Sequence, residues 1–445
     1  MKLKSPNNNQ QVITCHSKKI IVKKILLFGA GKSATVLIDY LLAEAPQNNW
    51  TIIIADTNRK MILAKTNNSP LVEAVETDIT NDEQRSKLIQ KASIVISMMP
   101  PALHFLIAKD CVEYGKNLLT ASYLDAAIKS LQTEVQNKKL LFICEMGLDP
   151  GIDHISAMKI IDGIKAKGGV ITSFKSHCGG LVAPESDDNP WHYKISWNPR
   201  NVVMAGKAGA EYKLNNKIHH KDYKELFTDC AEVKVDGIGN LAVYPNRDSL
   251  SYIPIYKLET ATTFLRTTLR YPSFCIGWNA IVQAGLANEM DTINTDGLTF
   301  AKWSSDIIPF INDSNKPLLH FLGLFDETLV PAHAITSADV LQHLLETRLV
   351  MQPADKDMII MLHEIEYELS GMLVKTESSL IVKGEDHLRT AMAKTVGLPL
   401  GIAAKLILNG TIQLTGIHIP TLKEIYEPVL HELKEAGICF KEREV

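Results

Sequence analysis

Gly29, Ala30 and Gly31 are the residues of this chain most able to bind a ligand, because they follow an apolar run and precede an amphipathic helical pattern. Gly29 permits a tight turn, and Gly31 lets backbone N–H groups approach a pyrophosphate at the positive end of the new helix. Asp56 ends the next apolar run, where this motif places a carboxylate that accepts from ribose hydroxyls. The pattern predicts a bound dinucleotide, and the alternative is a doubly wound sheet that has lost its ligand.

Polar clusters follow two further strands of the predicted sheet. Ser122 and Tyr123 come directly after the run 117–120, and Asp149 lies in a turn rich in glycine and proline. The carboxyl ends of parallel strands face the ligand crevice, so these side chains are placed to form hydrogen bonds there. The alternatives are a helix cap at Ser122 with a packed Tyr123, and a turn acid at Asp149. We favour a functional role for Asp149 and a surface position for His154.

Two arginines, Arg247 and Arg270, lie near predicted turns or strand ends. A guanidinium offers a planar fork that matches a carboxylate. Surface salt bridges explain each arginine taken singly, but together with a dinucleotide fold they suggest a substrate with several carboxylates. Residues 177–197 are rich in glycine, proline and aromatic residues and are expected to line the same site. His363 begins a zinc-like motif that lacks its second histidine, so we expect no metal.

The elements that must position these residues alternate between strand and helix in the first third of the chain. Strands are expected near 22–28, 51–55, 71–76, 93–97, 117–120 and 139–144. This rhythm predicts an α/β fold with a Rossmann-type parallel sheet. Longer alternating runs then predict a second α/β domain with a mixed sheet, at Val170–Phe174, Val202–Ala205, Glu232–Val235, Met358–Tyr367 and Leu373–Val382.

The domain boundaries follow from these changes of pattern. We expect a disordered tail over 1–20, a dinucleotide-binding domain over 21–148, a substrate and dimerisation domain over 149–275 and 351–399, and a helical insertion over 276–350. Residues 400–445 contain amphipathic stretches and are expected to pack back on the dinucleotide-binding domain.

The composition is that of an ordinary globular protein, with 445 residues, 46% hydrophobic residues, 22% charged residues and a net charge of −3. No basic stripe suits nucleic acid, and no uninterrupted apolar run approaches the roughly 18 residues that cross a bilayer. Seven scattered cysteines without a C-x-x-C pair predict reduced thiols and a cytoplasmic location. We therefore expect a small-molecule substrate, no nucleic acid, no membrane, and a homodimer.

Six segments stand in order along the chain: GAGKSA, TASY, GLDPGIDH, CGGLVAPESDDNPWHYKISW, YPNRDS and TLRY. Together they resemble saccharopine dehydrogenases of the glutamate-forming type. The resemblance implies a Rossmann domain, a second α/β domain and a small helical domain. It also implies that NAD or NADP is used to interconvert saccharopine with glutamate and 2-aminoadipate 6-semialdehyde. We favour NAD because Asp56 would repel a 2′-phosphate, although Arg59 is close enough to weaken that preference.

The same resemblance assigns site residues. Cofactor contacts are implied for Gly29, Ala30, Gly31, Lys32, Ser33, Asp56, Thr57, Asp78, Ile79, Met99, Ala121, Ser122, Leu148, Asp149, Pro150 and Asn198. Substrate contacts are implied for Ser122, Tyr123, Asp149, Arg247, Thr268, Leu269 and Arg270.

The candidate catalytic residues are Asp149 and Tyr123, which would handle the proton of the secondary amine. His177 and Trp191 depart from the usual family pattern, which affects the shape of the substrate pocket. Two alternatives remain: a dehydrogenase of another carboxyalkylated amine, such as a polyamine precursor, and a dinucleotide-binding protein without activity.

Overall fold

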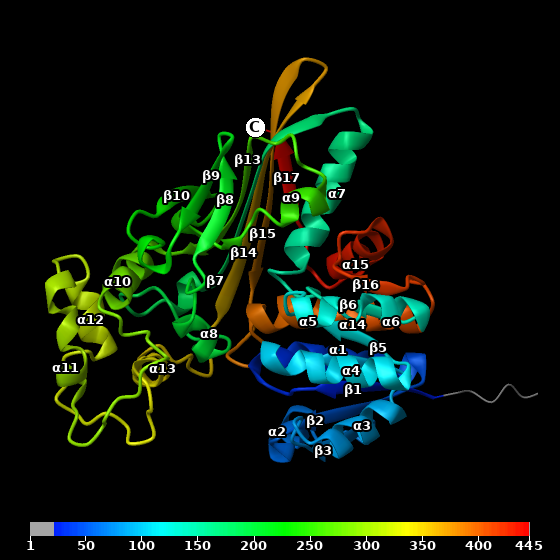
Figure 1. The fold of residues 1–445 in the computed structure, drawn as a ribbon, viewed down its shortest axis with the longest axis horizontal. Helices are drawn as coiled ribbons and strands as arrows, with labels where there is room; N and C mark the ends of the chain where they lie inside the picture. Colours follow the sequence, from blue (N-terminus) through cyan, green and yellow to red (C-terminus); the bar gives the residue numbers. More distant parts are fainter. Residues whose placement is uncertain (1–21, 445) are drawn as a thin grey trace, which may run out of the picture.

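The computed structural model describes residues 22–444, so the predicted disordered tail over 1–20 lies outside the described residues. The chain forms two lobes, each built on its own β-sheet (Figure 1). The first sheet is parallel and the second is mixed, which confirms the predicted α/β fold class.

The first lobe is a seven-stranded parallel sheet in the order β16-β6-β5-β4-β1-β2-β3. Its central strands are apolar and buried, as a sheet covered by helices on both faces requires. The strands are β1 (Lys23–Phe28), β2 (Trp50–Asp56), β3 (Val72–Glu76), β4 (Ile94–Ser97), β5 (Asn117–Thr120), β6 (Leu141–Ile143) and β16 (Gly416–His418). The helices are η1 (Lys32–Ala34), α1 (Thr35–Asn48), α2 (Arg59–Lys65), α3 (Asp82–Lys91), η2 (Pro101–Leu103), α4 (His104–Tyr114), α5 (Ala126–Lys129) and α6 (Gln132–Asn137).

The second lobe is a ten-stranded sheet whose main path runs β10-β11-β13-β7-β14-β15-β17. The helix α7 (Ile152–Ala166) connects the two sheets and packs its apolar side on β7 and β14. The strands are β7 (Val170–Val182), β8 (Ala210–Leu214), β9 (Lys217–Lys221), β10 (Ala231–Val235), β11 (Gly239–Pro245), β12 (Arg247–Asp248), β13 (Thr263–Arg270), β14 (Asp357–Leu369), β15 (Met372–Lys383) and β17 (Lys441–Glu444). Its short helices are η3 (Pro184–Ser186), η4 (Tyr223–Glu225) and α9 (Tyr252–Tyr256).

One predicted strand, Val202–Ala205, is wrong, because this segment overlaps helix α8 (Pro199–Val203). The side chain of Asn198 caps that helix by accepting from the Arg200 N–H at 2.9 Å, and Pro199 occupies the first turn. These start signals and the burial of the valines against α13 outweigh the strand preference of β-branched residues.

The helices that follow β13 and precede β14 in the sequence pack around a separate hydrophobic core, at the left of Figure 1. They are α10 (Pro272–Gln283), α11 (Phe300–Trp303), η5 (Ser305–Phe310), α12 (Lys316–Leu322) and α13 (Ser337–Arg348). After β15 the chain returns to the first lobe through α14 (Ala391–Leu408) and α15 (Lys423–Glu435). The C-terminal segment then contributes β16 to the first sheet and β17 to the second.

Helix α14 has the length and mean hydropathy, 1.5, of a membrane-crossing segment. However, 72% of this window is buried inside the protein, and the helix packs against α1 and α15. Two glycines make that contact close, since a Cβ at Gly397 or Gly401 would lie within about 3 Å of Leu37 or Tyr40. The hydropathy of α14 is that of a core helix.

Candidate active site between the two lobes

The glycine turn after β1 has the geometry that a dinucleotide needs. Gly29 has φ +95°, and a Cβ there would lie 3.0 Å from the Met98 carbonyl oxygen, so only glycine fits. Above Gly31 the space is open, because a Cβ at that position would meet nothing within 4 Å. Lys32 and Ser33 follow in η1, where Lys32 is exposed and Ser33 is half-buried. The cradle therefore leaves room for a phosphate at the start of the helix.

A pocket opens beside this turn at the carboxyl ends of β1, β2 and β4. It is lined by Phe28, Ala55, Asp56, Thr57, Thr77, Ile79 and Met99. Four of these seven residues carry predicted cofactor roles, so the fold brings predicted residues from distant segments together in one pocket. Asp78 lies next to the pocket in an exposed turn, where its carboxylate accepts from the Thr80 hydroxyl at 2.7 Å.

Asp56 already accepts two backbone hydrogen bonds, from the Ala30 N–H at 2.7 Å and the Asn58 N–H at 3.0 Å. Beside it, the Lys65 ammonium donates to the Gly31 carbonyl oxygen at 2.7 Å. Burial lowers the pKa of Lys65 to about 8, and the negative charge of Asp56 opposes that shift. Two backbone N–H groups and the nearby Lys65 ammonium therefore offset the negative charge of Asp56.

The second polar cluster lies at the end of β5. The Ser122 carbonyl oxygen accepts from the Glu145 N–H at 2.9 Å, which ties this loop to the loop after β6. The Ser122 hydroxyl lies 2.7 Å from Nε2 of His104. The helix-cap role considered for Ser122 belongs instead to Asp125, which accepts from the Ile128 N–H at 2.7 Å. Ala121 is half-buried beside Ser122.

Asp149 is held by an arginine of the other lobe. Nη2 of Arg266, on β13, lies 2.6 Å from Asp149 and 2.8 Å from Asp153. The guanidinium also lies over the Tyr252 ring at 4.6 Å, and Arg266 is only 2% exposed. Leu148 and Pro150 flank Asp149 and are buried. One buried cation is thus shared by two carboxylates.

The surroundings of Asp149 change its acidity. The pKa of Asp149 is raised to about 6, chiefly by burial and also by the charge of nearby Asp153, against the opposing charge of Arg266. The pKa of Asp153 is instead lowered, because the charges of His154 and Arg266 and backbone hydrogen bonds outweigh its burial. Two neighbouring carboxylates therefore differ in proton affinity, which suits one of them to exchange protons near neutral pH.

The predicted surface position of His154 is wrong. His154 is fully buried, with Nε2 2.8 Å from Glu145 and Nδ1 2.6 Å from the Tyr256 hydroxyl. The Tyr252 hydroxyl donates to the same Glu145 carboxylate at 3.0 Å. The first turn of α7 faces the second lobe rather than solvent, so this network supports the Asp149 loop from behind.

The predicted arginines both lie on the side of the second lobe that faces this cluster. Arg247, on β12, is exposed, and its guanidinium lies 5.2 Å from the centroid of the Tyr123 ring. Arg270 is buried beside the adjacent rings of Tyr193 and Phe274, with its guanidinium 5.4 and 5.3 Å from their centroids. Its Nη1 donates to the Leu269 carbonyl oxygen at 2.8 Å.

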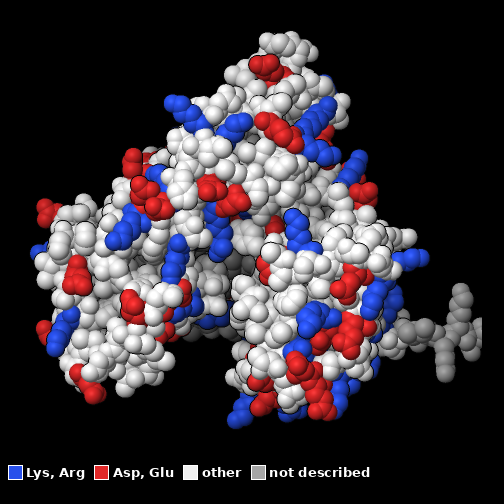
Figure 2. Space-filling model, in the orientation of Figure 1, with Lys and Arg blue, Asp and Glu red and all other residues white. Residues whose placement is uncertain are grey.

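Strand alternation separates the predicted residues of β13. Arg266, Thr268 and Arg270 share one face, whereas the Leu269 side chain lies in the apolar cluster on the other face. A ligand on the arginine face can therefore reach only the backbone of Leu269. Figure 2 shows a hollow between the two lobes, with Lys and Arg atoms on its inner wall. Asn198, the exposed cap of α8, belongs to the second lobe.

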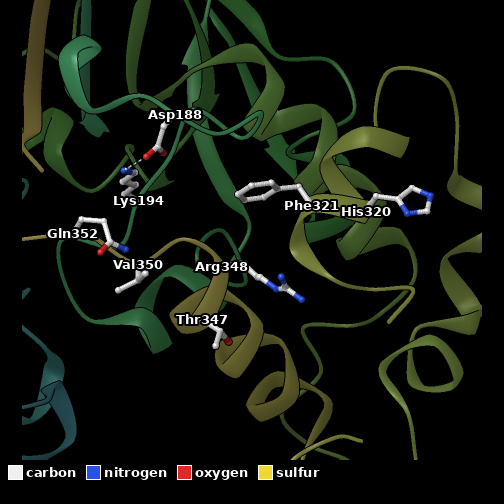
Figure 3. Close-up of a pocket in the computed structure, with 8 residues that line it drawn as sticks. All are labelled: Asp188, Lys194, His320, Phe321, Thr347, Arg348, Val350 and Gln352. Atoms are coloured by element: carbon white, nitrogen blue, oxygen red, sulfur yellow. Dashed lines mark hydrogen bonds and ion pairs between the residues drawn. The ribbon is translucent and has the colours of Figure 1, made fainter. Parts of the chain in front are cut away.

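A separate groove of about 540 Å³ lies where the helical insertion meets the loop after β7 (Figure 3). Its two central cations are already paired. Lys194 lies 2.8 Å from Asp188 and 2.7 Å from Asp355, and Arg348 pairs with Asp326. Arg270 differs from these two cations, because no Asp or Glu among the described residues forms an ion pair with it and its Nε has no hydrogen-bond partner.

The parallel sheet, its glycine turn and the facing arginine-lined lobe define a two-lobed dinucleotide-binding protein. Residues 25–143 match the family model described as the saccharopine dehydrogenase NADP binding domain, and residues 147–438 match the saccharopine dehydrogenase C-terminal domain. The chain belongs to the saccharopine dehydrogenase family.

Two relatives illustrate the similarity. The chain is 34% identical to the mitochondrial alpha-aminoadipic semialdehyde synthase of Bos taurus, over 99% of this chain and 49% of that protein. It is 32% identical to the saccharopine dehydrogenase (NADP(+), L-glutamate-forming) of Saccharomyces cerevisiae, over 95% and 99% of the two chains. The chain thus spans about half the length of the semialdehyde synthase and nearly all of the fungal dehydrogenase.

A solved structure agrees with this picture. The apo histidine-tagged saccharopine dehydrogenase (L-Glu forming) from Saccharomyces cerevisiae superposes with a TM-score of 0.85, at 29% identity, covering 95% of this chain and 100% of that one. The matching domain and the fungal enzyme are both named for NADP. A nicotinamide dinucleotide is therefore supported, and the predicted preference for NAD is not.

Two residues of the site, Arg266 and His104, are not among the predicted site residues. Arg266 stands four residues before Arg270 in the same strand pattern, so its alternation with Arg270 was an available signal. His104 follows a proline pair at the start of a helix and gives no local signal of its contact with Ser122.

Proposed function

We propose that this protein oxidises saccharopine with NADP, giving glutamate and 2-aminoadipate 6-semialdehyde, or catalyses the reverse condensation. The observation that carries the proposal is that the guanidinium of Arg270 is buried without an acidic partner in the described part of the chain. Its guanidinium is buried, its Nε has no hydrogen-bond partner, and no Asp or Glu among residues 22–444 forms an ion pair with it. A buried cation without an anion is costly, and a substrate carboxylate would supply that anion.

The choice of NADP rests on the family match and on the surroundings of Asp56. Both oxygens of this carboxylate accept backbone N–H groups, and the Lys65 ammonium contributes positive charge nearby. Arg59 opens helix α2 directly after the Asn58 cap, and its Nε donates to the Ala74 carbonyl oxygen at 3.1 Å. These cations offset the repulsion between Asp56 and a 2′-phosphate.

Each group at the site would have a separate role in the reaction. The bound nicotinamide supplies the hydride acceptor. Arg270 and Arg247 hold substrate carboxylates, so the secondary amine is presented between the lobes. Asp149 accepts the proton that the amine must lose, and Arg266 keeps that carboxylate in place. Water then splits the resulting imine into the amine of glutamate and the aldehyde.

The test is the absorbance of reduced nicotinamide when purified protein is mixed with saccharopine and either NADP or NAD. We expect reduction of NADP, at a higher kcat/KM than for NAD. A protein that binds NADPH and does not turn saccharopine over would contradict the proposal. Reduction seen only with NAD would contradict the assignment of the cofactor and leave the substrate assignment intact.

A further inference from the structure

A buried histidine joins the ends of three elements beneath Ser122. His104 is the first residue of α4 and is 2% exposed. Its Nδ1 lies 2.8 Å from the hydroxyl of Ser97, the last residue of β4, and its Nε2 lies 2.7 Å from the hydroxyl of Ser122. The Thr120 hydroxyl, at the end of β5, lies 3.3 Å from the same Nε2. The imidazole is therefore held on both nitrogens.

The ring stays neutral at physiological pH. Burial lowers the pKa of His104 to about 4, and the charge of Asp125 only partly opposes this. A neutral imidazole has one N–H donor and one lone pair, so one ring nitrogen donates to a hydroxyl and the other accepts from one, and either tautomer keeps the contact with Ser122. The hydroxyl of Ser122 has one donor and two acceptor positions, and His104 occupies one of these three.

The remaining freedom of Ser122 is limited by its backbone. Its carbonyl oxygen accepts from the Glu145 N–H at 2.9 Å, and its N–H donates to the Thr120 hydroxyl at 3.2 Å. Rotation about its Cα–Cβ bond is then the main freedom left to the side chain, and the contact with His104 selects one rotamer. The hydroxyl is thus oriented before any ligand arrives.

We propose that His104 is a positioning residue, which orients the Ser122 hydroxyl for the dinucleotide and the substrate without touching either. The inference rests on the proposed function, because that proposal places both ligands at Ser122. His104 is not one of the predicted cofactor-binding, substrate-binding or catalytic residues. Its consequence is that His104 acts only through Ser122.

A double-mutant cycle tests this dependence. The variants are His104→Leu, Ser122→Ala and their combination, and the readouts are kcat/KM for saccharopine and the Kd of NADPH measured by fluorescence. One neutral hydrogen bond corresponds to about a fivefold to tenfold effect, so His104→Leu should lower kcat/KM by that factor. In the Ser122→Ala background the same change should cost less than about twofold. Equal losses in both backgrounds would overturn the proposal.

A matched control separates positioning from general packing. His363 is also fully buried, lies 2.7 Å from a serine hydroxyl, that of Ser156, and has its pKa lowered to about 4 by burial. His363→Leu should lower thermal stability much as His104→Leu does, with kcat/KM changed less than about twofold. A similar loss of kcat/KM in both leucine variants would assign the effect to packing and overturn the proposal.

Two milder variants keep the test decisive if His104→Leu does not fold. His104→Gln can still contact Ser122 and should retain kcat/KM within about threefold. Ser97→Ala removes the partner of Nδ1, and its loss should disappear when Ser122 is alanine. A loss that persists would overturn the proposal. If the wild-type protein does not turn over saccharopine, the proposed function fails, and the same cycle read through the Kd of NADPH still decides the role of His104.

Discussion

The guanidinium of Arg247 lies 5.2 Å from the centroid of the Tyr123 ring, and this contact joins the two lobes across the candidate site. Tyr123 follows β5 of the parallel sheet, and Arg247 lies on β12 of the mixed sheet. A cation–π contact does not use the hydrogen-bond donors with which a guanidinium forms ion pairs, so the N–H groups of Arg247 stay able to bind a carboxylate.

Arg247→Met should therefore raise KM for saccharopine by about tenfold while leaving the free energy of unfolding within about 0.5 kcal/mol. Arg247 is exposed, so little packing is lost. Steady-state kinetics and urea unfolding measure the two effects. Arg348→Met, an exposed arginine of the separate groove, is the matched control and should leave KM unchanged. An unchanged KM in Arg247→Met would remove this residue from the site.

Arg270→Met should separate stability from function. The arginine is buried without an acidic partner in the described part of the chain, so its removal eliminates an uncompensated charge. We expect the free energy of unfolding without substrate to fall by less than about 1 kcal/mol or to rise. KM for saccharopine should rise by about tenfold to a hundredfold, the effect of a charge-assisted hydrogen bond. A large loss of stability with normal KM would mean that Arg270 is structural.

Arg266→Met should behave in the opposite way. It leaves the carboxylates of Asp149 and Asp153 buried without their shared cation, and breaking such a pair costs about 3 kcal/mol or more. Urea unfolding of the apoprotein measures this loss. Asp153→Asn keeps the bond of Arg266 to Asp149 and should cost less. If Arg266→Met unfolds no more easily than Arg348→Met, the guanidinium is not essential to the fold.

Asp149 should control the acidic side of the pH profile. Burial raises its pKa to about 6, so the carboxylate becomes protonated as the pH falls through that value. A proton acceptor must be ionised, so kcat/KM should decline below about pH 6. Asp149→Asn should lower kcat and abolish this decline. A decline that persists in Asp149→Asn would assign the titration to another group.

The local signals in the sequence account for the first lobe and not for the site as a whole. The turn after β1 and the strand that ends in Asp56 were predictable, because glycine conformation and apolar runs act over a few residues. The bond between Arg266 and Asp149 joins positions 117 residues apart, and no local pattern contains it. For the same reason His154 was misplaced, since the second lobe buries it. Arg247 and Arg270 were singled out by their positions near predicted turns and strand ends, the family resemblance then assigned them to the substrate, and their roles stay predictions.

Two buried histidines should make the fold sensitive to acid. Burial lowers the pKa of both His104 and His363 from 6.5 to about 4, so the unfolded chain binds protons that the folded chain excludes. Their stabilising effect is fully present above about pH 6.5 and is lost as the pH falls towards 4. Each should cost about 2 kcal/mol at about pH 5 relative to pH 7.5.

Asp149 opposes this trend, because its raised pKa favours the protonated folded state as the pH falls through about 6. That effect returns about 1 kcal/mol at about pH 5, so the net loss is about 2 to 3 kcal/mol. Urea unfolding at the two pH values measures it, and His363→Gln should reduce the difference without changing kcat/KM at neutral pH. If stability does not fall between these pH values, the two imidazoles are not excluded from protonation in the folded protein.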